Sequence, residues 1–428
     1  MIKMKDEYEE AESKIAERIK NGDRRLDRGS GCMLGGAAGD ALGYPVEFMS
    51  YEEIKKRYGA NGIRNYELTS DKAQISDDTQ MSIFTTTGIL TAIAGEAMEQ
   101  WSNIVGEMNR ILNRIGACRP GAECDDIQIQ NKYFNPTGYV RIAYKDWLVT
   151  QGEIEKDSMS QVTWVLGRWS ELYSRRCPGT TCITAIKSGK TGSLGNPCND
   201  SKGCGGVMRV APAGIALAKM LKPKRIAVIG AKIAAITHGH PLGYIPAAAM
   251  THMTAALYLG AEIKEAISDA VRCTSELFSQ TPHIDKFENI MSFTTELSDK
   301  NIDDAEAIAQ IGEGWVAEET LAIAAYCALK HKDDFAAGIR AAVNHSGDSD
   351  STGAVTGNIL GTYLGYSKIP PEFLRDLELR DKIAYLALTL GDVSLARVML
   401  ARHLYPVEEY HQMWFRYIRA YWAQRHYL

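Results

Sequence analysis

Small residues dominate the stretch Gly35-Gly36-Ala37-Ala38-Gly39-Asp40-Ala41-Leu42-Gly43-Tyr44-Pro45-Val46-Glu47. Because glycine and alanine have almost no side chain, another backbone can approach this stretch closely. Two acids, Asp40 and Glu47, would then be presented from a tight scaffold. By itself the stretch is equally compatible with a Gly-rich helix that ends in a turn at Gly43 and Pro45.

Helical periodicity dominates the chain around this stretch. Apolar patterns rich in Ala, Ile and Leu predict helices over 79–95, 223–237, 246–259, 304–311 and 315–345. Residues 226–238 are apolar nearly all round, which predicts a central and buried helix. Alternating runs of strand type are scarce. The sequence therefore predicts an all-α fold, a compact orthogonal bundle of helices.

Three regions break the helical pattern. Residues 1–28 are dense in charge and predict an N-terminal arm or short solvated helix that buries little surface. Residues 116–136 and 174–206 are rich in Gly, Pro, Asn, Cys and Ser, and predict long loops. The chain after Pro370-Pro371 is helical and aromatic. We expect an arm over 1–28, one domain over 29–369, and a C-terminal extension over 370–428 that packs on it.

The overall charge argues against several classes of partner. The formal net charge is −5, from 53 acidic and 48 basic residues, so nucleic acid and anionic membranes are not expected.

Neither a signal-peptide pattern nor an apolar run of about 18 residues is present, which predicts a cytoplasmic protein. The nine cysteines include no C-x-x-C pair and are odd in number, so we expect reduced thiols.

Ser76-Asp77-Asp78-Thr79 directly precedes a predicted helix. Acids at a helix start commonly cap it and match its dipole. One Asp would be enough for that purpose, and a second beside it adds repulsion between like charges. A hard divalent cation removes this repulsion. Capping and metal binding both remain open for this segment.

Oxygen-bearing side chains crowd the segment His345-Ser346-Gly347-Asp348-Ser349-Asp350-Ser351-Thr352-Gly353. In an extended loop, Asp348 and Asp350 can point to the same side. An EF-hand loop begins similarly, with Gly in its sixth position, but requires a bidentate Glu in its twelfth. That position is Ile359 here. The segment therefore predicts a metal site of another kind.

Together the two acidic clusters offer ligands that are all oxygen atoms. Such ligands suit Mg²⁺, Mn²⁺ or Ca²⁺ better than zinc or copper. The clusters are far apart in sequence and can meet only through the fold. Two ions about 4 Å apart can share a bridging water and lower its pKa.

These segments, in this order, resemble the ADP-ribosylglycohydrolases, the family of dinitrogenase reductase-activating glycohydrolase. The resemblance covers residues 30–367 and includes Gly205-Gly206-Val207-Met208-Arg209-Val210-Ala211-Pro212 and Thr237-His238. It implies an all-α enzyme with a binuclear Mg²⁺ or Mn²⁺ site. It also implies hydrolysis of ADP-ribose from a modified protein side chain, most often arginine. Hydrolysis of serine-linked ADP-ribose stays open as an alternative.

The resemblance also implies roles for individual residues. The metal ligands would be Ser76, Asp77, Asp78, Asp348, Asp350 and Ser351. The catalytic residues would be Asp77, Asp78, Asp350 and Glu47, and the ligand-binding residues Gly205, Gly206, Met208, Arg209 and His238. Relatives often have Gly-Asn-Gly where this chain has Gly203-Cys204-Gly205. His238, on an apolar helix, is equally compatible with a satisfied core residue.

Two other functions compete with this interpretation. Isoprenoid-diphosphate enzymes are also helical and Mg²⁺-dependent, but the third acid of their D-D-x-x-D pattern is missing at residue 81, which is Met. A non-enzymatic immunity protein would instead occlude an ADP-ribosyltransferase toxin through residues 1–28. The two functions can also coexist, in an enzyme that removes ADP-ribose and binds the toxin through residues 1–28.

Overall fold

The structure, a computed structural model, describes residues 2–94, 134–160, 163, 166–190 and 192–391. Helices form nearly all of its regular structure. They are α1 (Ile2–Lys20), α2 (Arg24–Gly43), α3 (Tyr51–Tyr58), a helix over 77–94, α5 (Pro136–Thr150), α6 (Thr180–Lys187), α7 (Ala211–Leu217), α8 (Pro223–Ala234), α9 (Pro241–Leu259), α10 (Ile263–Leu277), α11 (Ile284–Ser298), α12 (Asp304–Ile311), α13 (Ala317–Lys330), α14 (Phe335–Val343), α15 (Ser349–Leu364), α16 (Glu372–Arg375) and α17 (Arg380–Gly391).

One small hairpin and several short 3₁₀ helices complete the described structure. Strands β1 (Leu68–Thr69) and β2 (Lys72–Ala73) pair antiparallel, joined by Ser70 and Asp71, whose φ angles are both positive. The 3₁₀ helices are η1 (Tyr44–Val46), η2 (Lys156–Ser158), η4 (Leu166–Arg168), η5 (Ser170–Leu172), η6 (Cys204–Gly206) and η7 (Tyr366–Lys368). The predicted all-α class is confirmed.

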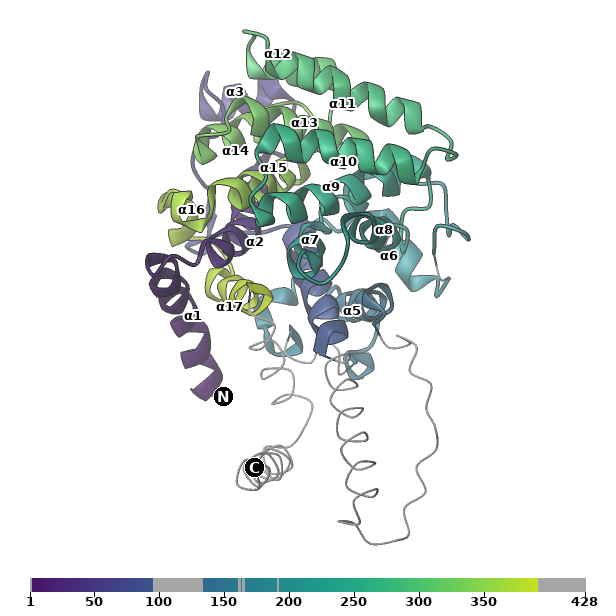
Figure 1. Ribbon diagram of the computed structural model, residues 1–428. Helices are drawn as coiled ribbons and strands as arrows, with labels where there is room; N and C mark the ends of the chain where they lie inside the picture. The colour runs from purple at the N-terminus through teal and green to yellow at the C-terminus, as the bar shows by residue number, and fades with distance from the viewer. Residues whose placement is uncertain (1, 95–133, 161–162, 164–165, 191, 392–428) are drawn as a thin grey trace, which may run out of the picture.

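Helices α2 and α15 lie side by side at the centre of the molecule (Figure 1). Helices α9 and α14 contact both of them, α13 contacts α15, and α7 and α17 contact α2. Both central helices are buried along most of their length. The two segments that meet here are more than 300 residues apart in the sequence.

Glycines allow the backbones of α2 and α15 to touch. A Cβ atom at Gly39 would lie 2.0 Å from the carbonyl oxygen of Gly353, and one at Gly31 would lie 2.0 Å from that of Gly361. On both helices the contacting glycines recur every four residues, which places them on one face. They are Gly31, Gly35, Gly39 and Gly43 on α2, and Gly353, Gly357 and Gly361 on α15. No larger residue fits at these positions.

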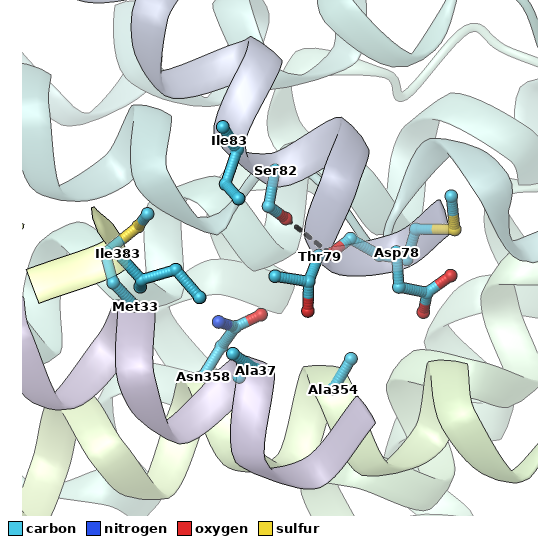
Figure 2. A pocket seen from close by; sticks show the side chains of 11 residues that line it. Met33, Ala37, Asp78, Thr79, Ser82, Ile83, Ala354, Asn358 and Ile383 are labelled. Carbon is cyan, nitrogen blue, oxygen red and sulfur yellow. Dashed lines mark hydrogen bonds between the residues drawn. The ribbon is translucent and has the colours of Figure 1, made fainter. Parts of the chain in front are cut away.

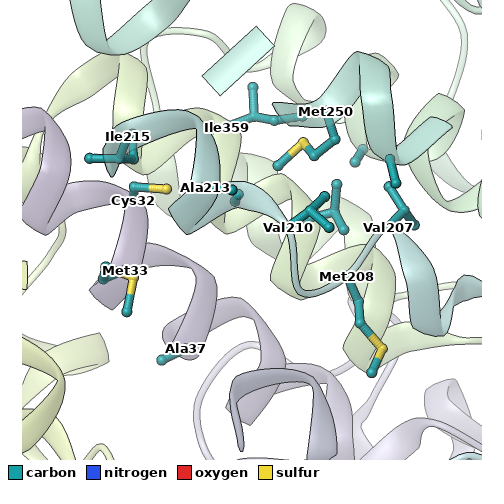
Figure 3. Close-up of a cluster of buried hydrophobic side chains, with 14 of the residues drawn as sticks. Cys32, Met33, Ala37, Val207, Met208, Val210, Ala213, Ile215, Met250 and Ile359 are labelled. Atoms are coloured by element: carbon teal, nitrogen blue, oxygen red, sulfur yellow. The ribbon is translucent and has the colours of Figure 1, made fainter. Parts of the chain in front are cut away.

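An apolar cluster fills the space between the central pair and α7 and α9. Figure 3 shows side chains of this cluster that come from α2 (Cys32 and Met33), from the segment that carries Met208 and Val210, and from α9 (Met250). The 207–210 segment is therefore anchored to the core by its own apolar side chains.

Several predicted helices differ from the observed ones. Residues 315–345 form two helices, α13 and α14, because Asp334 starts a new helix by accepting a hydrogen bond from the Ala337 N–H at 3.0 Å. Helix α9 begins at Pro241, earlier than the predicted residue 246, because proline fits the first turn of a helix and His240 caps it. Helix α12 has the predicted bounds, and α8 is largely buried as expected.

The predicted loop over 174–206 contains a helix, α6. Its sequence Thr180–Lys187 is short and is flanked by Gly, Pro and Cys, which hid the helical pattern. Most of the other predicted loop, 116–136, lies outside the described residues, as do the residues of the aromatic tail after 391.

The N-terminal segment packs on the rest of the chain. Tyr8, Ala11 and Ile15 of α1 are buried, and the Tyr8 ring makes edge contacts with Trp169 and Tyr385. The expectation that this segment buries little surface is therefore wrong, because its few apolar residues are spaced so that they share one face of the helix. The domain boundaries stay predictions, although residue 28 lies inside α2.

Within the described ranges, every helix is either too short or too polar to cross a membrane.

Gly357→Ala tests the central contact. The new Cβ would lie 2.0 Å from the Gly35 carbonyl oxygen. Overpacking should cost about 3 kcal/mol of unfolding free energy, which outweighs the gain of about 1 kcal/mol in helix propensity. Urea denaturation measures the difference. Gly195→Ala is the control, because its Cβ meets no atom within 4 Å. Equal stability of the two variants would contradict the prediction.

Candidate metal centre

The two acidic clusters meet at the starts of two helices, beside the end of α2. Asp77 and Asp78 begin the helix over 77–94, and Asp348 and Asp350 begin α15. Asp350 lies close enough to Asp77 and Asp78 for its charge to raise their pKa values, after burial, so the two clusters are neighbours. Carboxylate oxygens of Glu47, Asp348 and Asp350 all lie within 4.8 Å of one another. All of these acids are buried.

Asp40 connects the central helices to the first cluster. Its carboxylate accepts hydrogen bonds from the N–H of Ser76 at 3.0 Å and from the N–H of Thr79 at 3.1 Å, and also from the Thr79 hydroxyl. These bonds satisfy donors at the start of the helix over 77–94. Asp40 therefore positions Ser76, Asp77 and Asp78.

Helix capping explains some of the acids but not all of their oxygen atoms. Asp348 and Asp350 both accept a hydrogen bond from the Ser351 N–H, at 3.3 and 2.8 Å. Asp77 accepts one from the Gly179 N–H at 3.3 Å. Among the described residues, however, the buried oxygens Oε2 of Glu47 and Oδ2 of Asp78 have no hydrogen-bond partner. A bound cation would satisfy both.

The charges of the cluster are costly without a positive partner. Burial, and then repulsion from Asp350, raises the pKa of Glu47 to about 11. The same two causes raise the pKa values of Asp77 and Asp78 well above the usual range. Burial also raises the pKa values of Asp348 and Asp350. Five buried acids with raised pKa values and only oxygen ligands fit one or more hard divalent cations.

The loop over 203–206 lies against the acidic cluster. Burial, and then the charge of Asp348, raises the pKa of the Cys204 thiol well above its usual range, and the Cys204 N–H donates to the Trp315 carbonyl at 3.2 Å. A Cβ at Gly205 would lie 2.9 Å from Cys182 Sγ and 2.9 Å from the His238 ring. Gly205 therefore has no space for a side chain.

A cavity of about 10 Å³ lies behind Asp78, enough for about one water molecule. Figure 2 shows Asp78 and Thr79 on one side of it, with Ala37 and Ala354 of the central helices opposite. Met208, a predicted ligand-binding residue, also lines this cavity, and its sulfur accepts a hydrogen bond from the Ser351 hydroxyl at 3.9 Å. A ligand of the size of ADP-ribose does not fit there.

Arg209 and His238 support the loop from inside the protein. Arg209 is fully buried, stacks over the Tyr144 ring at 4.4 Å, and donates to the Thr237 hydroxyl at 2.6 Å. His238 hydrogen bonds to the same hydroxyl at 2.8 Å, and burial, aided by Arg209, lowers its pKa to about 3. Both side chains therefore lie behind the loop. Their predicted contact with a ligand stays a prediction, and Arg209 has no exposed surface in this structure.

Two exposed aromatic side chains lie beside the cluster. Phe48 follows Glu47 and is 70% exposed, and Trp315 is 38% exposed. Their rings stack at 5.8 Å between centroids, with an angle of 18° between planes. Exposed Glu313 is close by, and its carbonyl accepts a hydrogen bond from the Asp348 N–H at 2.9 Å. The sequence analysis missed this pair, because neither residue belongs to a motif.

Comparisons with known proteins agree with the resemblance noted in the sequence. The family model described as ADP-ribosylglycohydrolase matches residues 21–402. An Archaeoglobus fulgidus protein named only as uncharacterized is 25% identical over 376 residues, 86% of this chain and 97% of its own. The ADP-ribosyl-[dinitrogen reductase] glycohydrolase of Rhodospirillum rubrum is 23% identical over 358 residues, 83% and 91% of the two chains.

A solved structure shares the fold. It is an ADP-ribosylglycohydrolase-related protein complex, 20% identical, with a TM-score of 0.51, covering 87% of this chain and 99% of that one.

The raised pKa values predict a pH dependence of stability when a chelator is present. Burial, and then Asp350, raises the pKa of Asp40 to about 7, above the value near 4 of an unfolded Asp. Between these values the folded state binds more protons than the unfolded state, so its stability falls as the pH rises. The melting temperature in EDTA should be lower at pH 8 than at pH 6, with about 1 kcal/mol from Asp40.

Asp40→Asn should weaken this dependence, because it removes one titrating group. Excess Mn²⁺ should weaken it as well, since the cation replaces the protons. A melting temperature in EDTA that is equal at both pH values, or higher at pH 8, would contradict the prediction.

Proposed function

Because the chain belongs to the ADP-ribosylglycohydrolase family, we propose that it hydrolyses ADP-ribose from a modified protein with the aid of two Mg²⁺ or Mn²⁺ ions. The convergence of the two acidic clusters carries this proposal, together with Oε2 of Glu47 and Oδ2 of Asp78, which have no hydrogen-bond partner in the described part of the chain. The ions would be held by Ser76, Asp77, Asp78, Asp348, Asp350 and Ser351. Bound divalent cations lower the pKa of water and anchor hydroxyl groups.

The reaction exchanges one bond for another at the ribose. The oxygen of a water molecule bonds to the anomeric carbon, the bond from that carbon to the leaving group breaks, and the leaving group receives a proton. Glu47 is suited to move this proton, because its carboxylate lies at the site, with an oxygen within 4.8 Å of carboxylate oxygens of Asp348 and Asp350.

We propose arginine as the modified residue. Its guanidinium is planar and cationic, and such groups stack on aromatic rings. Phe48 and Trp315 offer an exposed aromatic surface beside the cluster, and Glu313 adds a negative charge. A serine leaving group would use neither feature. The aromatic pair therefore favours the arginine linkage.

Protection against an ADP-ribosyltransferase toxin stays a prediction. A protein that occludes a toxin through residues 1–28 would need to present them to a partner. Three side chains of this segment, Tyr8, Ala11 and Ile15, are instead buried within this chain. Enzymatic removal of ADP-ribose is therefore the function that the structure supports better.

Asp350→Ala tests the metal-assisted reaction. The variant lacks a proposed metal ligand, whose carboxylate lies beside those of Glu47 and Asp348, so turnover should fall about 100-fold or more. Release of ADP-ribose from a modified protein measures it, and EDTA should abolish the wild-type activity. Asp299→Ala, an exposed acid remote from the cluster, is the control. Full activity of the wild type in excess EDTA would sink the proposal.

The arginine preference predicts different rates with two substrates. Release should be faster from arginine-linked than from serine-linked ADP-ribose. Trp315→Ala should lower kcat/KM on the arginine substrate about 10-fold, as expected for a lost cation–π contact, and change the serine substrate less. Trp315→Phe should retain most activity, and Leu259→Ala controls for loss of an exposed apolar residue. Faster release from serine would overturn the preference.

A further inference from the structure

A buried ion pair lies beneath the first acidic cluster. The Arg176 guanidinium donates through Nη2 to Oε1 of Glu378 at 2.9 Å, and both side chains are only 11% exposed. Arg176 precedes α6, and Glu378 lies between α16 and α17. The pair therefore joins the region 174–179 to the C-terminal segment, two regions that share no local sequence pattern.

Glu378 fixes the residues that lead into Ser76. Its Oε2 atom accepts a hydrogen bond from the Ile75 N–H at 3.1 Å. Its own N–H donates to the Ala73 carbonyl at 3.0 Å, and the Ala73 N–H donates to the Asp376 carbonyl at 2.9 Å. The C-terminal segment thus holds the backbone on the N-terminal side of Ser76.

Arg176 and its neighbours fix Asp77 from the other side. The Arg176 carbonyl accepts a hydrogen bond from the Asp77 N–H at 3.1 Å, and the Gly179 N–H donates to the Asp77 carboxylate at 3.3 Å. Cys177, between them, has a φ of 50°, a conformation that non-glycine residues keep only where the surroundings impose it. The backbone of the segment 176–179 is therefore held in one conformation beside Asp77.

We propose that Arg176 and Glu378 are positioning residues for the metal ligands Ser76 and Asp77. This inference rests on the proposed metal-assisted function. The ion pair fixes the separation of the two segments between which Ser76 and Asp77 are held. A buried ion pair adds little net stability compared with apolar residues, but it specifies one geometry, which a metal site requires.

The test is the affinity for Mn²⁺, measured by titration calorimetry on the full chain. Glu378→Gln keeps an acceptor for the Ile75 N–H but loses the charge that pairs with Arg176. This variant and Arg176→Gln should each bind Mn²⁺ about 10- to 100-fold more weakly, the usual effect of removing a partner that orients a metal ligand. Glu12→Gln is the matched control, because it breaks a neighbouring ion pair, with Arg380, away from the site. It should bind Mn²⁺ as the wild type does.

A double variant separates positioning from stability. Arg176→Gln/Glu378→Gln removes both charges, so its melting temperature should recover relative to the single variants while its Mn²⁺ affinity stays weak. Recovery of the affinity together with the melting temperature would overturn the inference, since the single variants would then act only through an unpaired buried charge. Single variants that melt earlier but bind Mn²⁺ within twofold of the wild type would overturn it too.

Arg176→Lys keeps the inference testable if the other variants do not fold. It retains the cation opposite Glu378 but lacks the planar fork of arginine. It should fold and bind Mn²⁺ several-fold more weakly, and wild-type affinity would contradict the inference. If the wild type binds neither Mn²⁺ nor Mg²⁺, the proposed function itself fails, which is a result distinct from equal affinities of all variants.

Discussion

Direct contact between the backbones of α2 and α15 sets the geometry on which the site depends. At the facing glycines, the carbonyl oxygens of one helix occupy the space that a side chain on the other would need. The last turn of α2, with Asp40, and the first turn of α15, with Asp348 and Asp350, are thereby brought to the same end of the pair. Asp40 then holds the start of the helix over 77–94 through Ser76 and Thr79. The acids meet because two helices have no side chains between them.

This arrangement concentrates negative charge where it is poorly solvated. Two helix starts, at residues 77 and 349, direct their partial positive charge toward the acids. Such a contribution is worth about 1 kcal/mol per helix, which is small beside the cost of several buried carboxylates. Burial, and then repulsion from Asp350, raises the pKa values of Glu47, Asp77 and Asp78. Divalent cations are the natural counter-charge.

The parts of the site that could be predicted are those written in contiguous residues. Ser76-Asp77-Asp78 and Asp348–Ser351 are dense local patterns, and the structure brings them together, although their role as ligands stays a prediction. Arg176 and Glu378 could not be found in this way, because each is an ordinary charged residue until the fold pairs them across 202 positions. Phe48 and Trp315 were missed for the same reason.

The fold was predictable in class but not in every element. Residues 315–345 gave one long helical pattern because apolar residues continue on both sides of the break. Only the capping geometry of Asp334 shows where α14 starts. Helix α6 is too short for periodicity to reveal.

The bridge between Ala73 and Leu377 has a consequence for synthesis of the chain. Ribosomes add about 5–20 residues per second, so about 15–60 s separate the emergence of Asp77 from that of Glu378. During this interval α2 lacks α15, and its glycine face is uncovered. The first acidic cluster still lacks the segment 176–179 until that segment emerges, and it lacks Asp348 and Asp350 for most of the interval. In a nascent chain, therefore, the metal centre cannot form stepwise from the N-terminus. The site is complete only when residues up to Glu378 have left the ribosome.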